Sequence, residues 1–166
     1  ENTHSTENVN LFLQMNCAII RTPNADRAFA HIHRILGGSI MGNKKYVAYV
    51  GTYTHGNSKG IQVYDVDVEN GKLIERGEVK VSNASHTAVS KNGKFLYSIE
   101  DEGVAVFQRD KHGDLTRINS VGIDGMRGCF LATDVDGRYL YVAGYHDGKV
   151  TVVHTHKDGS LGRIMD

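Results

Sequence analysis

The sequence predicts an all-β protein built from repeated four-stranded units. Three observations support this fold class. The 166 residues include 19 glycines but one proline and no tryptophan. Short runs rich in valine, tyrosine and isoleucine alternate with glycine-containing turns, which is the pattern of successive strands and hairpins. The whole pattern of strands and turns also recurs along the chain at a nearly constant interval, which is typical of a repeat architecture.

The strands can be followed in order from Tyr46. The first is predicted at Tyr46–Gly51 and the second at Ile61–Val68, and a third at Lys72–Val79 follows the turn Glu69-Asn70-Gly71. The next predicted strands lie within His86–Ser90, Lys94–Glu100, Val104–Gln108 and Leu115–Asn119. Each is bounded by Asn-Gly, Gly or charged residues, which favour tight turns.

The repeat is clearest between Ser90–Ile118 and Thr133–Ile164, and Tyr46–Leu73 is a weaker copy. Asn92-Gly93 in the first stretch corresponds to Asp136-Gly137 in the second. Four short strands per roughly 40–45 residues is the blade pattern of β-propellers. A β-sandwich or an open meander would not require the same turn to recur at this interval. The residues after Met41 suffice for about three blades, whereas rings close with about 4–8, so we expect the N-terminal part of a longer protein.

Residues 1–40 differ from the rest and are predicted to stand outside the natural domain, which would occupy residues 41–166. Ala25–Leu36 could form a short amphipathic helix, because Phe29, Ile32 and Ile35 would share one face. Met41 followed by Gly-Asn-Lys-Lys has the form of a native start. The first 40 residues are therefore interpreted as a non-native, partly helical extension.

Composition excludes several classes of function. The 19 basic and 19 acidic side chains balance, and nucleic acids or anionic membranes require a cationic surface. Leu11–Ile20 is too short for the roughly 20 apolar residues of a membrane helix, and no basic segment precedes it as in a signal peptide. Two cysteines, Cys17 and Cys129, make no disulfide framework. We therefore expect a cytoplasmic protein with no nucleic-acid or membrane partner; the oligomeric state is left open.

A family resemblance covers Tyr46 to about Arg163. Val50–Leu73, Asn83–Gln108 and Arg127–Val152 together resemble the start of the 6-phosphogluconolactonase, or lactonase, β-propeller family. The GTYT turn, the Ser-x-Asn-Gly-Lys turn and the Asp-Gly-Arg-Tyr-Leu turn occur in the family's order and spacing. The resemblance implies a seven-bladed ring, of which this chain would hold about three blades.

The same resemblance implies an activity. It implies hydrolysis of a phosphorylated sugar lactone, 6-phosphoglucono-δ-lactone, to 6-phosphogluconate in the oxidative pentose phosphate pathway, with no cofactor and no metal. Two alternatives stay open: a propeller that acts on another lactone, such as a muconolactone, and a non-catalytic interaction scaffold. Fold alone does not separate them.

The chain departs from the family at two motifs. Asn83–Thr87 reads Asn-Ala-Ser-His-Thr where many members have Asn-Pro-Ser-Tyr-Leu. Gly128-Cys129-Phe130 stands where many have Pro-Cys-His. No catalytic histidine can therefore be transferred to position 130. A histidine instead occupies the matching place one blade earlier, at His86.

Three residues are predicted to carry the chemistry. Lactone opening requires an activated water, a donor for the developing oxyanion and, for this substrate, a cation for the phosphate. His86 is predicted as general base, Arg127 as phosphate ligand and His146 as a further catalytic candidate. Each has a structural alternative: His86 could be packed at a strand start, Arg127 could be a solvated loop residue, and His146 could belong to a tight turn.

Further substrate contacts are expected from the same loops. The candidates are Tyr53, Thr54, Asn83, Ser85, Glu100 and Cys129. Cys129 is expected to line the channel without acting as a nucleophile, because nothing around it lowers a thiol pKa. His154 and His156 point the same way along a strand, but without a third ligand they predict no metal site.

Overall fold

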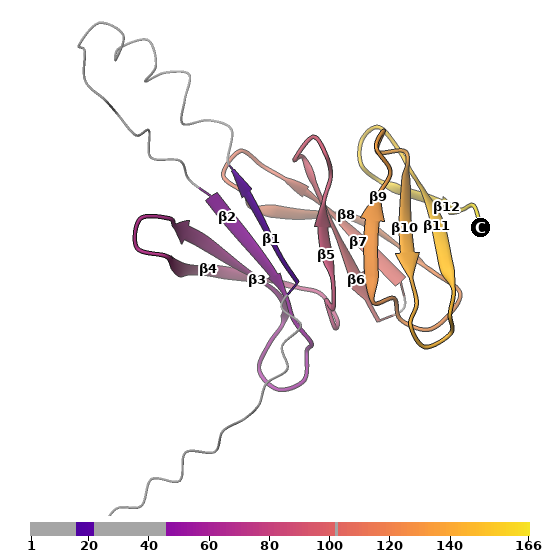
Figure 1. Cartoon of the computed structure of the whole chain (residues 1–166), viewed down its shortest axis with the longest axis horizontal. Helices are drawn as coiled ribbons and strands as arrows, with labels where there is room; N and C mark the ends of the chain where they lie inside the picture. Colours follow the sequence, from indigo (N-terminus) through magenta and orange to yellow (C-terminus); the bar gives the residue numbers. More distant parts are fainter. Residues whose placement is uncertain (1–15, 22–45, 102) are drawn as a thin grey trace, which may run out of the picture.

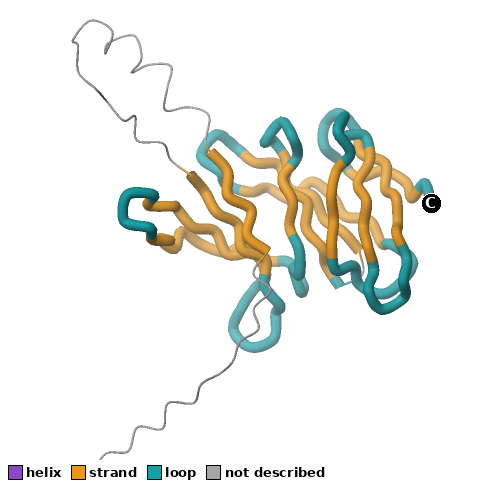
Figure 2. Tube along the Cα trace, in the orientation of Figure 1, coloured by secondary structure: helices purple, strands orange, loops and turns teal. Residues whose placement is uncertain are grey.

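The computed structural model describes residues 16–21, 46–101 and 103–166. These residues form twelve strands in three antiparallel four-stranded sheets, with no helix among them (Figures 1 and 2). Each sheet runs in simple succession, so every strand pairs with its neighbours in sequence. The prediction of an all-β chain with three four-stranded blades is confirmed. Nowhere in the described ranges is there a helix long and apolar enough to cross a membrane.

The three sheets correspond to the three predicted repeats, and we call them blades 1, 2 and 3. Blade 1 contains β1 (Asn16–Arg21), β2 (Tyr46–Gly51), β3 (Gly60–Asp67) and β4 (Lys72–Lys80). Blade 2 contains β5 (Thr87–Val89), β6 (Phe95–Glu100), β7 (Gly103–Arg109) and β8 (Leu115–Gly122). Blade 3 contains β9 (Phe130–Thr133), β10 (Tyr139–Ala143), β11 (Val150–Thr155) and β12 (Leu161–Ile164).

The N-terminal segment contributes a strand to blade 1. β1 pairs antiparallel with β2 from Asn16 opposite Gly51 to Arg21 opposite Tyr46. It therefore holds the place in blade 1 that β5 and β9 hold in blades 2 and 3. The helix expected at 25–36 lies outside the described residues. That the natural domain begins at Met41 stays a prediction.

The hydrophobic core lies between the blades. One cluster joins blades 1 and 2 and includes Tyr49 and Phe107, which are at most 1% exposed. A second joins blades 2 and 3 and includes Ile99, Leu140 and Val153, each 0% exposed. A single four-stranded sheet leaves both faces open, so stacking the blades is what removes these side chains from water.

Blade 1 approaches the loop between β4 and β5 so closely that only glycine fits at Gly51. A Cβ there would lie 2.3 Å from the backbone oxygen of Ala84. We expect Gly51→Ala to lower the free energy of unfolding by about 1–3 kcal/mol, as overpacking does. Gly77→Ala in β4 is the matched control, because nothing lies within 4 Å of a Cβ at Gly77. Urea unfolding measures both, and equal losses would contradict this account.

The strand directions separate the connections into two groups at opposite ends of the blades. The loops 52–59 and 144–149, after β2 and β10, lie at the lower edge in Figure 1. The loops that lead into β5 and β9 lie at the same end. The turns between β5 and β6, β9 and β10, and β11 and β12 lie at the upper edge. Nearly all predicted site residues therefore belong to one end, which we call the mouth.

Candidate active site at the mouth of the blades

A hydrogen-bonded network at the mouth links blades 1 and 2 to the loop that leads into blade 3. Its centre is Asp101, which directly follows β6. One oxygen, Oδ1, accepts a hydrogen bond from Asn83 Nδ2 at 2.7 Å and one from Arg127 Nη1 at 3.1 Å. Asn83 comes from the loop between blades 1 and 2, and Arg127 from the loop between blades 2 and 3. The carboxylate thus holds together the loops that enter the innermost strands β5 and β9.

The loop after β2 completes the network from blade 1. The Thr54 amide and hydroxyl both donate to Asn83 Oδ1, at 2.9 and 3.2 Å. The Tyr53 ring lies under the Arg127 guanidinium, whose central carbon is 5.0 Å from the ring centroid. This cation–π contact orients the arginine. The structure therefore brings together four predicted residues: Tyr53, Thr54, Asn83 and Arg127.

The backbone at Asn83 is adapted to this role. Its φ of 47° lies in the left-handed region, which asparagine tolerates better than most residues. The Ser85 amide donates to the Asn83 carbonyl at 2.6 Å, which closes a tight local turn. This conformation turns the Asn83 side chain toward Thr54 on one side and Asp101 on the other.

The network keeps Asp101 ionised. The Asn83 hydrogen bond, followed by the Arg127 contact, holds the pKa of Asp101 below its ordinary value against the opposing effect of burial. An ionised carboxylate with a lowered pKa is a weak proton acceptor. The role of Asp101 in the network is to position Asn83 and Arg127. The Arg127 side chain is 30% exposed and can still offer donors to a ligand.

His86 directly precedes β5 and follows Asn83 of the network by three residues. Burial lowers the pKa of its imidazole, so the ring is neutral at pH 7. Its Nδ1 accepts a hydrogen bond from the Leu131 amide at 3.4 Å, and its ring lies 4.5 Å from the ring of Phe130. An accepting Nδ1 selects the tautomer with the proton on Nε2. In this tautomer Nε2 carries a hydrogen and is a hydrogen-bond donor. To act as a base at Nε2, the ring would need the other tautomer, with the hydrogen on Nδ1.

Ser85 and Cys129 lie on the same two loops. The Ser85 hydroxyl donates to the Gly128 carbonyl at 3.3 Å, which joins the two loops. The Cys129 amide and thiol both donate to the Ala143 carbonyl, at 2.8 and 3.3 Å. The thiol is exposed, and its hydrogen bond goes to a backbone oxygen.

Two predicted residues have their contacts elsewhere. Glu100 accepts two hydrogen bonds from Arg117 Nη2 of β8, at 2.8 and 3.0 Å, and so pairs within blade 2. His146 is exposed in the loop after β10, where its ring contacts Tyr145. The Asp147 carboxylate orders that loop by accepting from the Met126 and Lys149 amides. No contact joins Glu100 or His146 to the network among the described residues.

The sequence offers both Glu100 and Asp101 as residues that could orient a partner; Glu100 was selected as the substrate contact, but the structure places Asp101 in the network. Neighbouring residues at a strand end point to opposite sides of the sheet. Asp101 comes one residue after the end of β6, so its side chain points to the side opposite that of Glu100; this alternation is the signal that could have selected it.

In the described ranges no three His, Cys, Asp or Glu side chains lie close enough together to hold a metal ion. His154 and His156 contact each other edge to face.

The family model described as "Lactonase, 7-bladed beta-propeller" matches residues 47–166. The chain belongs to the seven-bladed lactonase β-propeller family. Among its curated relatives is the 6-phosphogluconolactonase of Bacillus subtilis strain 168, 42% identical over 123 residues. That match covers 70% of the chain and 35% of the relative, so the chain spans about a third of its length.

Solved lactonase-family structures give the same result. A Bacteroides fragilis protein, described as a candidate 6-phosphogluconolactonase, superposes with a TM-score of 0.70 at 31% identity. That match covers 78% of this chain and 37% of the other. The periplasmic gluconolactonase of Pseudomonas aeruginosa superposes with a TM-score of 0.66 at 29% identity, over 74% and 38% of the two chains. The predicted family resemblance and partial propeller are confirmed.

Proposed function

We propose that the complete propeller containing this chain hydrolyses 6-phosphoglucono-δ-lactone to 6-phosphogluconate. The reaction would serve the oxidative pentose phosphate pathway in the cytoplasm. The observation that carries the proposal is the oriented arginine at the mouth, in a chain 42% identical to a 6-phosphogluconolactonase over 123 residues. A guanidinium offers several donors in a fixed planar arrangement that suits a phosphate.

Arg127 is proposed to bind the substrate phosphate. Asp101 and Tyr53 fix the guanidinium from two directions, so less side-chain freedom is lost when the ligand binds. Asn83 in turn holds Asp101, and Thr54 holds Asn83. Ser85, Cys129, Glu100 and His146 remain proposed contacts whose roles depend on how the lactone lies across the mouth.

His86 is proposed to assist ring opening as a hydrogen-bond donor from Nε2. Water adds to the lactone carbonyl carbon, the carbonyl oxygen becomes an oxyanion, and the ring C–O bond then breaks to leave an acid and a hydroxyl. A neutral imidazole N–H aimed at the carbonyl oxygen would stabilise the oxyanion as it forms. The role of general base, expected from the sequence, is the alternative for the same side chain.

Two substitutions of His86 separate these roles. In the complete protein we expect His86→Ala to lower kcat about 100-fold, the effect of removing one oxyanion donor. His86→Gln keeps an N–H donor on a side chain of similar reach but cannot act as a base near neutral pH. We therefore expect His86→Gln to retain clearly more activity than His86→Ala in a proton-release assay. Equal losses in the two variants would favour the general base.

A non-phosphorylated sugar lactone is a second candidate substrate, favoured by the likeness to the Pseudomonas gluconolactonase. The test is an assay of the complete protein with 6-phosphoglucono-δ-lactone and with glucono-δ-lactone, at a pH where spontaneous hydrolysis is slow. The proposal predicts turnover above background and a preference for the phosphorylated lactone. An absence of turnover by a folded, complete propeller would contradict the proposal and favour a binding role.

A further inference from the structure

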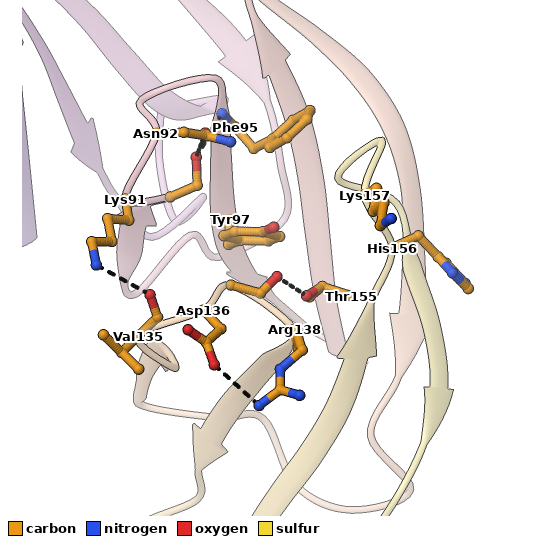
Figure 3. Close-up of a pocket in the computed structure, with 12 residues that line it drawn as sticks. Lys91, Asn92, Phe95, Tyr97, Val135, Asp136, Arg138, Thr155, His156 and Lys157 are labelled. Atoms are coloured by element: carbon orange, nitrogen blue, oxygen red, sulfur yellow. Dashed lines mark hydrogen bonds and ion pairs between the residues drawn. The ribbon is translucent and has the colours of Figure 1, made fainter.

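A pocket lies between blades 2 and 3 at the end opposite the mouth. It has a volume of about 560 Å³ and is lined by the turns between β5 and β6, β9 and β10, and β11 and β12 (Figure 3). Phe95 and Tyr97 of β6 supply aromatic surface, and both are at most 8% exposed. All lining residues belong to this chain.

The pocket exists because a short side chain replaces an arginine at one position of the repeat. Arg109 ends β7, and its amide donates to the Lys94 carbonyl at 2.7 Å, while its guanidinium donates to the Gly93 carbonyl. Thr155 ends β11 in the same way, with its amide 2.8 Å from the Arg138 carbonyl and its hydroxyl 2.7 Å from the Gly137 carbonyl. A threonine at this place leaves open the space that a guanidinium would enter.

The Tyr97 hydroxyl in the pocket lacks the partners that its counterpart has. Tyr49 of β2 donates to the Gly113 carbonyl at 2.5 Å and accepts from Arg109 Nε at 2.8 Å. Tyr97 holds the corresponding place in β6 and is only 2% exposed. Its hydroxyl makes no hydrogen bond with any described residue. Burial raises the pKa of Tyr97 to about 12, so the hydroxyl stays protonated and can donate to a ligand.

The charge around the pocket is positive. Lys91, Arg138 and Lys157 line it against one carboxylate, that of Asp136, which is paired with Arg138 at 3.1 Å. Within the described ranges no carboxylate pairs with Lys91 or Lys157. Figure 3 shows Tyr97 amid the lining residues, with Lys91 on one side and Lys157 on the other. A cation would meet like charges here, whereas an anion would meet opposite ones.

We propose that this inter-blade pocket binds a small organic anion. Its carboxylate or phosphate head accepts from the Tyr97 hydroxyl and lies near Lys91 and Lys157, and its apolar body packs against Phe95. The site is separate from the mouth and goes beyond the proposed lactonase activity, because none of its residues belongs to the Asp101 network. Failure of one proposal therefore leaves the other standing.

The test uses two probes of the same shape and opposite charge, benzoate and benzamidinium, added to the full chain. ¹H–¹⁵N correlation spectra would locate each probe. We expect saturable benzoate binding with shifts at Gly137 and Lys157, which line the pocket, and little effect of benzamidinium. Thr155→Arg should weaken benzoate binding at least about tenfold. Because this variant adds positive charge, the loss would come from filling the pocket.

A second variant keeps the test decisive if Thr155→Arg does not fold. Lys91→Gln combined with Lys157→Gln removes the two cations that no described carboxylate pairs with, without changing the core, and should also weaken benzoate binding about tenfold. Lys94→Gln, on the same turn but outside the lining, is the matched control and should bind as the parent chain does. Stronger binding of benzamidinium, shifts confined to another region, or no loss in the variants would overturn the proposal.

Discussion

Arg127→Ala is expected to lower kcat/KM for 6-phosphoglucono-δ-lactone in the complete protein roughly 10- to 100-fold. A hydrogen bond to a charged group contributes about 1.5–3 kcal/mol, which corresponds to that range. Arg127 is held by Asp101 and Tyr53 at the mouth, so its loss removes a cation already in place for the phosphate. The kcat/KM of Arg127→Lys should lie between those of the parent protein and Arg127→Ala, because lysine keeps the charge but not the planar donor array.

The substrate without phosphate supplies the control for this prediction. If Arg127 binds the phosphate, Arg127→Ala should change kcat/KM for glucono-δ-lactone little. A general disturbance of the mouth would instead lower both activities in proportion. Arg163→Ala is a matched variant, because Arg163 is an exposed arginine of β12 with no ion pair among the described residues. It should leave both activities unchanged.

Leu140→Ala is expected to lower the free energy of unfolding of the 166-residue chain by about 2–5 kcal/mol. Leu140 is 0% exposed and lies in the core between blades 2 and 3. Truncation removes its apolar contacts and leaves a cavity that the two sheets can only partly close. Since a small domain is stable by only about 5–15 kcal/mol, the loss would be a large share of the total.

The neighbouring residue is a control for Leu140→Ala on the same strand. Tyr141 points to the opposite face of β10 and is 40% exposed. Tyr141→Ala should cost less than about 1 kcal/mol in the same chain. Urea unfolding of both variants would measure the difference. Equal losses would contradict the conclusion that the core lies between the blades.

The strands and blades could be predicted because their signals are local. Glycine-containing turns and short runs rich in valine, tyrosine and isoleucine mark β6 and β7, and the same turns recur in blade 3. β1 was not predicted, since Asn-Cys-Ala-Ile-Ile-Arg lies outside the repeated pattern and its place depends on pairing with β2. Strand pairing between distant segments is a tertiary effect that a local pattern does not contain.

The site could be predicted only in part for the same reason. Loop positions in successive blades selected Asn83 and Arg127, which the structure does bring together through Asp101. The choice of Glu100 over Asp101 depended on which of two neighbours turns toward the mouth, and Glu100 pairs with Arg117 instead. The inter-blade pocket depends on Thr155, which stands where the repeat has Arg109 one blade earlier. This difference opens a space only when the blades are stacked, so the sequence alone does not show it.

The most direct test of the central claim is a crystal structure of the complete protein with 6-phosphogluconate bound. We expect the phosphate at the mouth, with Arg127 donating to it while Asp101 still accepts from Asn83. His86 Nε2 should lie within hydrogen-bond distance of the product carboxylate. A product molecule whose phosphate lies away from Arg127, at the mouth or elsewhere on the propeller, would contradict the assignment of this network as the active site.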